Sequence, residues 1–96
     1  MKHIFIINPA AGKYDRTEEF SGKIAAACAS RGLDYAIHVS EKPGDCRATA
    51  RRAAESGEEV RLYACGGDGT LNEVVNGAAG FANAAVTHFP GGSGND

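Results

Sequence analysis

The stretch from Cys65 to Gly77, CGGDGTLNEVVNG, holds the residues of this sequence that are best suited to chemistry. Three glycines surround Asp68 in the run 66–69, and an apolar pattern with helical spacing follows at once. A chain places glycines this densely where its backbone must turn sharply or where another group comes close to the main chain. That group is either a ligand or a neighbouring strand.

An Asp-Gly pair between apolar runs is typical of a two-residue hairpin turn. The apolar residues after Gly69, however, recur at helical rather than alternating spacing: Leu71, Val74, Val75 and Ala78. We therefore expect the loop to join a strand to a helix. The bare amides of such a loop, together with the first turn of the helix, form a positively polarised site for an anion, most often phosphate.

The polar residues of the loop have separate interpretations. Thr70 is expected to be the N-cap of the helix, and Glu73 completes a Thr-x-x-Glu capping box, which gives this acid a structural role near a phosphate site. Asp68 is either a local hydrogen-bond acceptor in the turn or a partner of the Mg²⁺ that accompanies nucleotide phosphates, directly or through water. We favour the magnesium role.

Two common phosphate-binding motifs are excluded by spacing. The Walker motif GxxxxGK[ST] fails because Gly12-Lys13 lacks the first glycine and is followed by Tyr14. The dinucleotide fingerprint GxGxxG would begin at Gly67 and would need glycine at the position of Asn72. The loop is therefore a phosphate loop of another kind.

The remaining chain alternates between strand-like and helix-like segments. Strands are expected at residues 3–8, 33–39, 60–65 and 84–90, and helices at 20–31, 45–56 and 71–79. This alternation predicts an α/β fold with three α/β/α layers and a mainly parallel, Rossmann-like sheet. Ligands of such sheets bind at the carboxyl ends of the strands, where three loops fall: NPAAGK, CGGDGT and PGGSGND.

Composition narrows the class of protein. With 43% hydrophobic and 23% charged residues and a net charge of −2, the chain is typical of a soluble globular domain and has no basic excess for nucleic acid. No apolar run reaches membrane-spanning length. The three cysteines show no CxxC spacing, so we expect buried thiols in a reducing cytoplasm. Because the 96 residues end on a glycine-rich loop, we expect a fragment of a longer protein.

Other polar residues have ordinary structural interpretations. We expect structural roles rather than metal binding for His3, His38 and His88, and a core position rather than a nucleophilic role for Cys65. Lys13 either reaches a phosphate or is a solvated loop lysine. A solvated helix face is expected for the basic cluster Arg47, Arg51 and Arg52.

GGDGTLNEVVNG, with NPAAGK upstream and GSGND downstream, resembles the diacylglycerol kinase catalytic-domain family, which includes bacterial lipid kinases and the sphingosine and ceramide kinases. GGDG alone is shared with NAD kinases and phosphofructokinases, so TLNEVVNG and GSGND make the resemblance specific. It covers essentially the whole chain. It implies that residues 1–96 are the N-terminal ATP-binding domain of a lipid kinase, with a NAD kinase/phosphofructokinase-like fold.

The resemblance also implies a set of nucleotide-binding residues. One wall of the ATP site would be formed by Asn8, Pro9, Ala10, Ala11 and Gly12. The phosphates would be wrapped by Gly66, Gly67, Asp68, Gly69, Thr70, Leu71 and Asn72. Ser40 and Ser93 stand where the family usually has threonines, and serine keeps the hydroxyl. Asp68 and Asp96 would belong to the acidic network around Mg²⁺.

The implied activity is transfer of the γ-phosphate of ATP to a hydroxyl of diacylglycerol or a related lipid. The family's second, β-rich domain, with the lipid site and a catalytic acidic motif, has no counterpart here, so the isolated chain is expected to be inactive. The implied partners are ATP, a lipid and, transiently, the cytoplasmic membrane surface; homo-oligomerisation stays open. The alternatives are a NAD kinase-like or sugar kinase nucleotide domain, and a nucleotide-binding module without catalysis.

Overall fold

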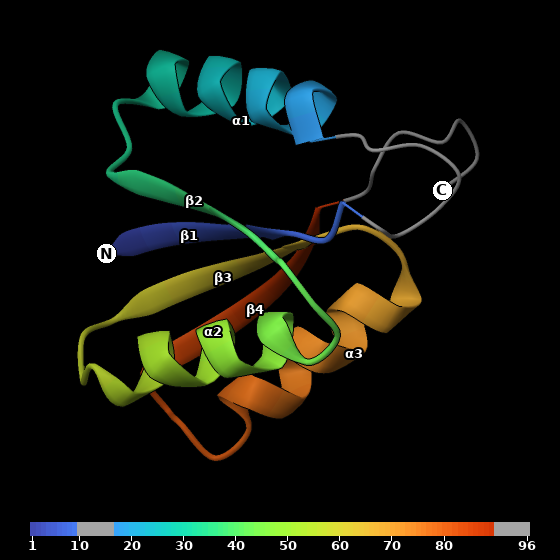
Figure 1. The fold of residues 1–96 in the computed structure, drawn as a ribbon. Coiled ribbons are helices and arrows are strands. Elements are labelled where there is room, and N and C mark those ends of the chain that lie inside the picture. The colour runs from blue at the N-terminus through green and yellow to red at the C-terminus, as the bar shows by residue number, and fades with distance from the viewer. Residues whose placement is uncertain (10–16, 90–96) are drawn as a thin grey trace.

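A computed structural model describes residues 1–9 and 17–89 of the chain. The elements follow in the order β1 (Lys2–Ile7), α1 (Thr17–Arg31), β2 (Tyr35–Val39), α2 (Asp45–Glu55), β3 (Val60–Cys65), α3 (Asp68–Ala78) and β4 (Ala84–Phe89). The four strands form one sheet in the order β2-β1-β3-β4, and every neighbouring pair is parallel. Figure 1 shows α1 on one face of this sheet and α2 and α3 on the other. The predicted three-layer α/β fold is confirmed.

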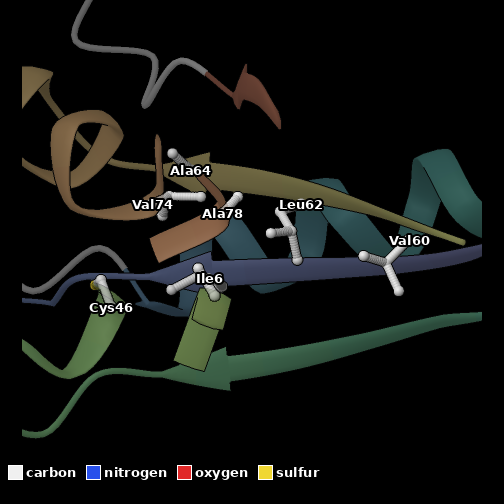
Figure 2. Close-up of a cluster of buried hydrophobic side chains, with 8 residues drawn as sticks. Ile6, Cys46, Val60, Leu62, Ala64, Val74 and Ala78 are labelled. Carbon is white, nitrogen blue, oxygen red and sulfur yellow. The ribbon is translucent and has the colours of Figure 1, made fainter. Parts of the chain in front are cut away.

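Apolar side chains on both faces of the central strands explain why the sheet lies between helices. In β1, Ile6 packs with the buried residues beneath α2 and α3, whereas Phe5 and Ile7 pack with those beneath α1. Figure 2 shows the first cluster, in which Ile6, Leu62 and Val74 come from β1, β3 and α3. A strand with two buried faces needs such a continuous apolar run, and HIFII provides it.

The helix ends follow the local sequence. Gly32 has φ of 63° directly after α1, where a left-handed residue is favourable after the last helical turn and glycine adopts it without steric cost. The expected ends of α2 and β3 differ from the observed ones by no more than one residue. The beginning of α3 lies three residues earlier than expected, at Asp68.

Helices α2 and α3 pack unusually closely at one point. A Cβ atom at Gly77 of α3 would lie 2.3 Å from the backbone oxygen of Arg47 and 2.8 Å from Cβ of Ala50, both in α2. These distances are shorter than real Cβ contacts, so only glycine fits at position 77 without a backbone shift. Gly77 is buried and marks the crossing of the two helices.

The strand order creates a topological switch point between β1 and β3. From β1 the chain passes through α1 to β2 on one side, and from β3 it passes through α3 to β4 on the other. In open parallel sheets ligands bind in the crevice outside the carboxyl ends of the two strands at this point. A ligand site is therefore expected at the residues that follow β1 and β3.

No helix within residues 1–9 and 17–89 has both the length and the apolar character needed to cross a membrane.

Candidate functional site

Backbone hydrogen bonds bring the carboxyl ends of three strands together. The N–H of Ser40, after β2, donates to the carbonyl of Ile7 at 2.8 Å, and the N–H of Asn8, after β1, donates to the carbonyl of Cys65 at 3.3 Å. Ser40, Asn8 and Gly66 consequently follow three adjacent strands at the same edge of the sheet. The structure thus brings together one predicted residue from each strand end.

The glycine loop between β3 and α3 is short and extended. Gly66 has φ of 156°, Gly67 has φ of −92° and ψ of −163°, and α3 begins at the next residue, with the Leu71 N–H donating to the Gly67 carbonyl at 3.1 Å. Asp68 and Gly69 form the start of the helix rather than the middle of a hairpin. The hairpin interpretation is therefore wrong, and the strand–loop–helix interpretation is confirmed.

Among the described residues, the space on the outer side of the loop is open. Gly67, Asp68 and Gly69 are exposed, and a Cβ built at Gly67 or Gly69 would meet no described atom within 4 Å. The first N–H groups of an α-helix have no partner inside the helix, and they give its N-terminus a partial positive charge. Exposed amides without side chains in front of them can approach an anion directly.

The expected cap at Thr70 is wrong. Gly67, in an extended conformation, occupies the N-cap position, and the helix begins at Asp68. Glycine has no side chain that could make a cap hydrogen bond. Thr70 is the third helical residue, its side chain is 1% exposed, and its Oγ1 has no hydrogen-bond partner among the described residues. This oxygen is therefore unsatisfied among the described residues, and a buried hydroxyl without a partner costs free energy.

Glu73 makes a different contact from the one expected of a capping box. Its Oε1 accepts a hydrogen bond from the backbone N–H of Arg47 at 3.3 Å. Arg47 is the third residue of α2, whose first intrahelical bond is donated by Ala48 to Gly44, so the Arg47 N–H has no partner within its own helix. Glu73 therefore caps the neighbouring helix instead of its own.

We expect Thr70→Val to raise stability without nucleotide. Valine has the shape of threonine and replaces the unpartnered Oγ1 by a methyl group, which should increase the free energy of unfolding by about 1 kcal/mol. The loss of a cap would instead lower it by roughly 1 kcal/mol. Urea unfolding of the two proteins measures the sign, and a lower midpoint for Thr70→Val would contradict the structural assignment of this hydroxyl.

Ser40 is placed at the edge but is largely buried. The residue is 8% exposed. Burial also raises the pKa of the Cys46 thiol, because it penalises the thiolate. Burial likewise raises the pKa of Cys65 to about 12. All three cysteines are buried and free, so the expectation of buried thiols, including a core position for Cys65, is confirmed.

The turn that contains Ser40 is held by Asp45, the first residue of α2. One carboxylate oxygen accepts hydrogen bonds from the Glu41 N–H at 2.9 Å and from His38 Nε2 at 3.2 Å. The Glu41 N–H, followed by His38, lowers the pKa of Asp45 because both stabilise the carboxylate. The acid therefore links the end of β2 to the beginning of α2.

Two structural features were not predicted from the sequence. His88 of β4 lies with Nε2 2.8 Å from the Gly66 carbonyl oxygen, which places a side chain of β4 against the glycine loop. Gly77 allows α2 and α3 to approach each other. A glycine inside a helical pattern is a signal that could have indicated Gly77, whereas His88 has no comparable local signal.

The other polar predictions have the following outcomes. His3 makes a structural hydrogen bond, with Nδ1 2.7 Å from the Tyr63 hydroxyl oxygen. The helix face with Arg47, Arg51 and Arg52 is exposed, as expected. Six predicted residues lie outside the described residues: Ala10, Ala11, Gly12, Lys13, Ser93 and Asp96.

Comparison with known proteins identifies the family that this chain resembles. The family described as "Diacylglycerol kinase catalytic domain" matches residues 2–96. A diacylglycerol kinase of Staphylococcus aureus is 42% identical over 77 residues, covering 77% of this chain and 23% of the relative. One from Staphylococcus saprophyticus is 40% identical over 76 residues, covering 77% and 24%. A crystal structure of a diacylglycerol kinase from Bacillus anthracis superposes with a TM-score of 0.69 at 27% identity, covering 99% of this chain and 35% of that one.

The chain spans about a quarter of the length of these curated relatives, 23% and 24%. The family match nevertheless extends over nearly the whole chain and includes the glycine loop. The chain belongs to the diacylglycerol kinase catalytic domain family.

Proposed function

We propose that this chain is the ATP-binding part of a lipid kinase that transfers the γ-phosphate of ATP to a hydroxyl of diacylglycerol or a related lipid. One observation supports this most strongly: at the switch point of the sheet, an exposed glycine loop leads into the N-terminus of α3 beside the unpartnered Thr70 hydroxyl. Amides, a helix N-terminus and a free hydroxyl together suit a polyphosphate.

In this proposal different groups of residues bind different parts of the nucleotide. The backbone of 66–72 wraps the phosphates, and the Thr70 hydroxyl donates to a phosphate oxygen. Asn8 and Pro9, after β1, form part of the wall on the other side of the switch point, with Ala10, Ala11 and Gly12 continuing it. Ser40 contributes its hydroxyl from the end of β2, and Ser93 contributes the corresponding group after β4.

The proposed magnesium partners are Asp68 and Asp96. Asp68 is exposed at the first position of α3, next to the proposed phosphate site. The described residues contain no group of three or more acidic, histidine or cysteine side chains that could hold a metal ion by itself. Asp68 still suits Mg²⁺, since this ion is usually held by one or two carboxylates together with substrate phosphates. When bound, the ion would neutralise charge on the phosphates.

Phosphoryl transfer needs the acceptor oxygen in line with the γ-phosphorus and the leaving ADP. The lipid site and the catalytic acid are proposed to lie outside these 96 residues. We also place the protein in the cytoplasm, at the membrane surface during turnover. The isolated chain should accordingly bind Mg-ATP without transferring phosphate.

The test is phosphate transfer by the full-length protein. It is incubated with ATP labelled at the γ-position and, separately, with diacylglycerol, ceramide, NAD⁺ and a sugar. We expect label in a lipid, and no transfer by the 96-residue chain. Label in NAD⁺ or the sugar would favour the related kinases that share the GGDG motif. Mg-ATP binding without transfer to any acceptor would indicate a non-catalytic nucleotide-binding module.

A further inference from the structure

His88 is the one described side chain of β4 with a hydrogen bond to the glycine loop. His88 is half-buried and lies opposite Ala64 in the β3–β4 register. Ala64 is two residues before Gly66 in the chain. The Nε2 of His88 is 2.8 Å from the Gly66 carbonyl oxygen. A carbonyl only accepts hydrogen bonds, so Nε2 must hold the proton in this contact, and the bond fixes the ring tautomer.

This bond controls the orientation of the peptide between Gly66 and Gly67. The described backbone contains no cis peptide bond, and in a planar trans peptide the C=O and N–H groups point in opposite directions. Fixing the Gly66 carbonyl toward His88 therefore directs the Gly67 N–H away from β4. Without Cβ atoms on either side of the peptide, little steric preference exists for this orientation over others.

We propose that His88 is a positioning residue for phosphate binding: by holding the Gly66 carbonyl, it presents the Gly67 N–H to the phosphates of the bound nucleotide. This inference rests on the proposed function. His88 does not touch the nucleotide; it acts through the Gly66–Gly67 peptide. Its contribution should therefore fall on the phosphate part of the ligand and not on the nucleoside.

A purely structural role is the competing explanation, because the same bond also ties β4 to the loop. His3 offers a matched control. His3 is a half-buried strand histidine whose Nδ1 lies 2.7 Å from the hydroxyl oxygen of Tyr63 in β3. It lies near the amino end of β1, whereas the glycine loop follows the carboxyl end of β3. Removing either histidine contact costs a hydrogen bond, yet only His88 is near the loop.

The experiment compares His88→Phe, His88→Gln and His3→Phe in the full-length protein. Calorimetry gives the dissociation constants for Mg-ATP and for adenosine, and thermal melts report folding. We expect His88→Phe to weaken Mg-ATP binding about tenfold, the size of one lost phosphate contact, with adenosine affinity within about twofold. His88→Gln keeps an N–H donor and should recover most of the loss. His3→Phe should lower the melting temperature and leave the affinities for Mg-ATP and adenosine unchanged.

The outcomes separate this inference from the proposed function. If the wild type does not bind Mg-ATP, the proposed function fails and the role of His88 fails with it. If the wild type binds and folded His88→Phe binds equally well, or loses adenosine and Mg-ATP alike, the positioning role alone is wrong. Should His88→Phe not fold, ¹⁵N NMR of the wild type decides: an Nε2-protonated ring and a Gly67 amide that shifts with added triphosphate support the inference, and an Nδ1-protonated ring or an unmoved amide overturns it.

Discussion

Gly67→Val should abolish most of the nucleotide affinity while leaving the domain folded. The backbone of Gly67, with φ of −92° and ψ of −163°, is one that valine adopts readily, and a Cβ here would meet no described atom within 4 Å. The branched side chain would instead occupy the open space in front of the loop amides. We expect calorimetric titration to show Mg-ATP affinity reduced well over tenfold, equivalent to more than about 1.4 kcal/mol.

Gly22→Val is the matched control for this substitution. Gly22 is an exposed residue of α1 whose Cβ position is equally open, so the same side chain is added away from the glycine loop. The affinity of the Gly22→Val protein for Mg-ATP should stay within about twofold of the wild-type affinity, a difference below about half a kcal/mol. Wild-type affinity in a folded Gly67→Val protein would show that the loop is a tight turn and does not hold the phosphates.

Gly77→Ala should be the most destabilising single-carbon change in the described part of the chain. The new Cβ would lie 2.3 Å from the Arg47 carbonyl oxygen, and because the obstacle is backbone, α2 and α3 must move apart. Overpacking of this kind costs typically 1–3 kcal/mol, and we expect about 3 kcal/mol because Ala50 lies in the way as well. Urea unfolding of both proteins measures this loss.

Gly22→Ala separates the steric effect from helix propensity. Both glycines lie inside helices, where alanine is intrinsically favoured by about 0.5–1 kcal/mol. Because the space around Gly22 is open, alanine should stabilise the protein there and destabilise it at position 77. Equal shifts of the unfolding midpoint at both positions would mean that α2 and α3 separate without cost.

Local patterns predicted most of the fold. The expected bounds of β3 match the observed Val60–Cys65, because the mainly apolar VRLYAC lies between two acidic residues at 58–59 and the glycines that follow it. The predicted start of α3 is too late because Thr70 and Glu73 match a capping box, which makes Thr70 the expected N-cap. The helix instead begins at Asp68, and both Thr70 and Val74 are buried residues of it.

The site was predictable only as far as contacts are local. The alternation of strands and helices placed Asn8 and the glycine loop at the carboxyl ends of the strands, and the family resemblance added Ser40; backbone hydrogen bonds bring these strand ends together. The partners of Glu73 and Gly66 were not predictable, since Arg47 is 26 residues from Glu73 and His88 is 22 residues from Gly66. Such pairs depend on which strands and helices become neighbours, which residue spacing within one segment does not encode.

The central position of β1 delays its completion during synthesis. Its two neighbours pair His3 with Tyr35 and Ile7 with Cys65, so β1 gains its second partner only after residues 60–65 have been synthesised. Chains emerge at about 5–20 residues per second, so the apolar edge formed by Phe5, Ile6 and Ile7 stays unpaired for seconds. A nascent chain stalled before residue 60 would expose this edge to other nascent chains, and aggregation would begin there.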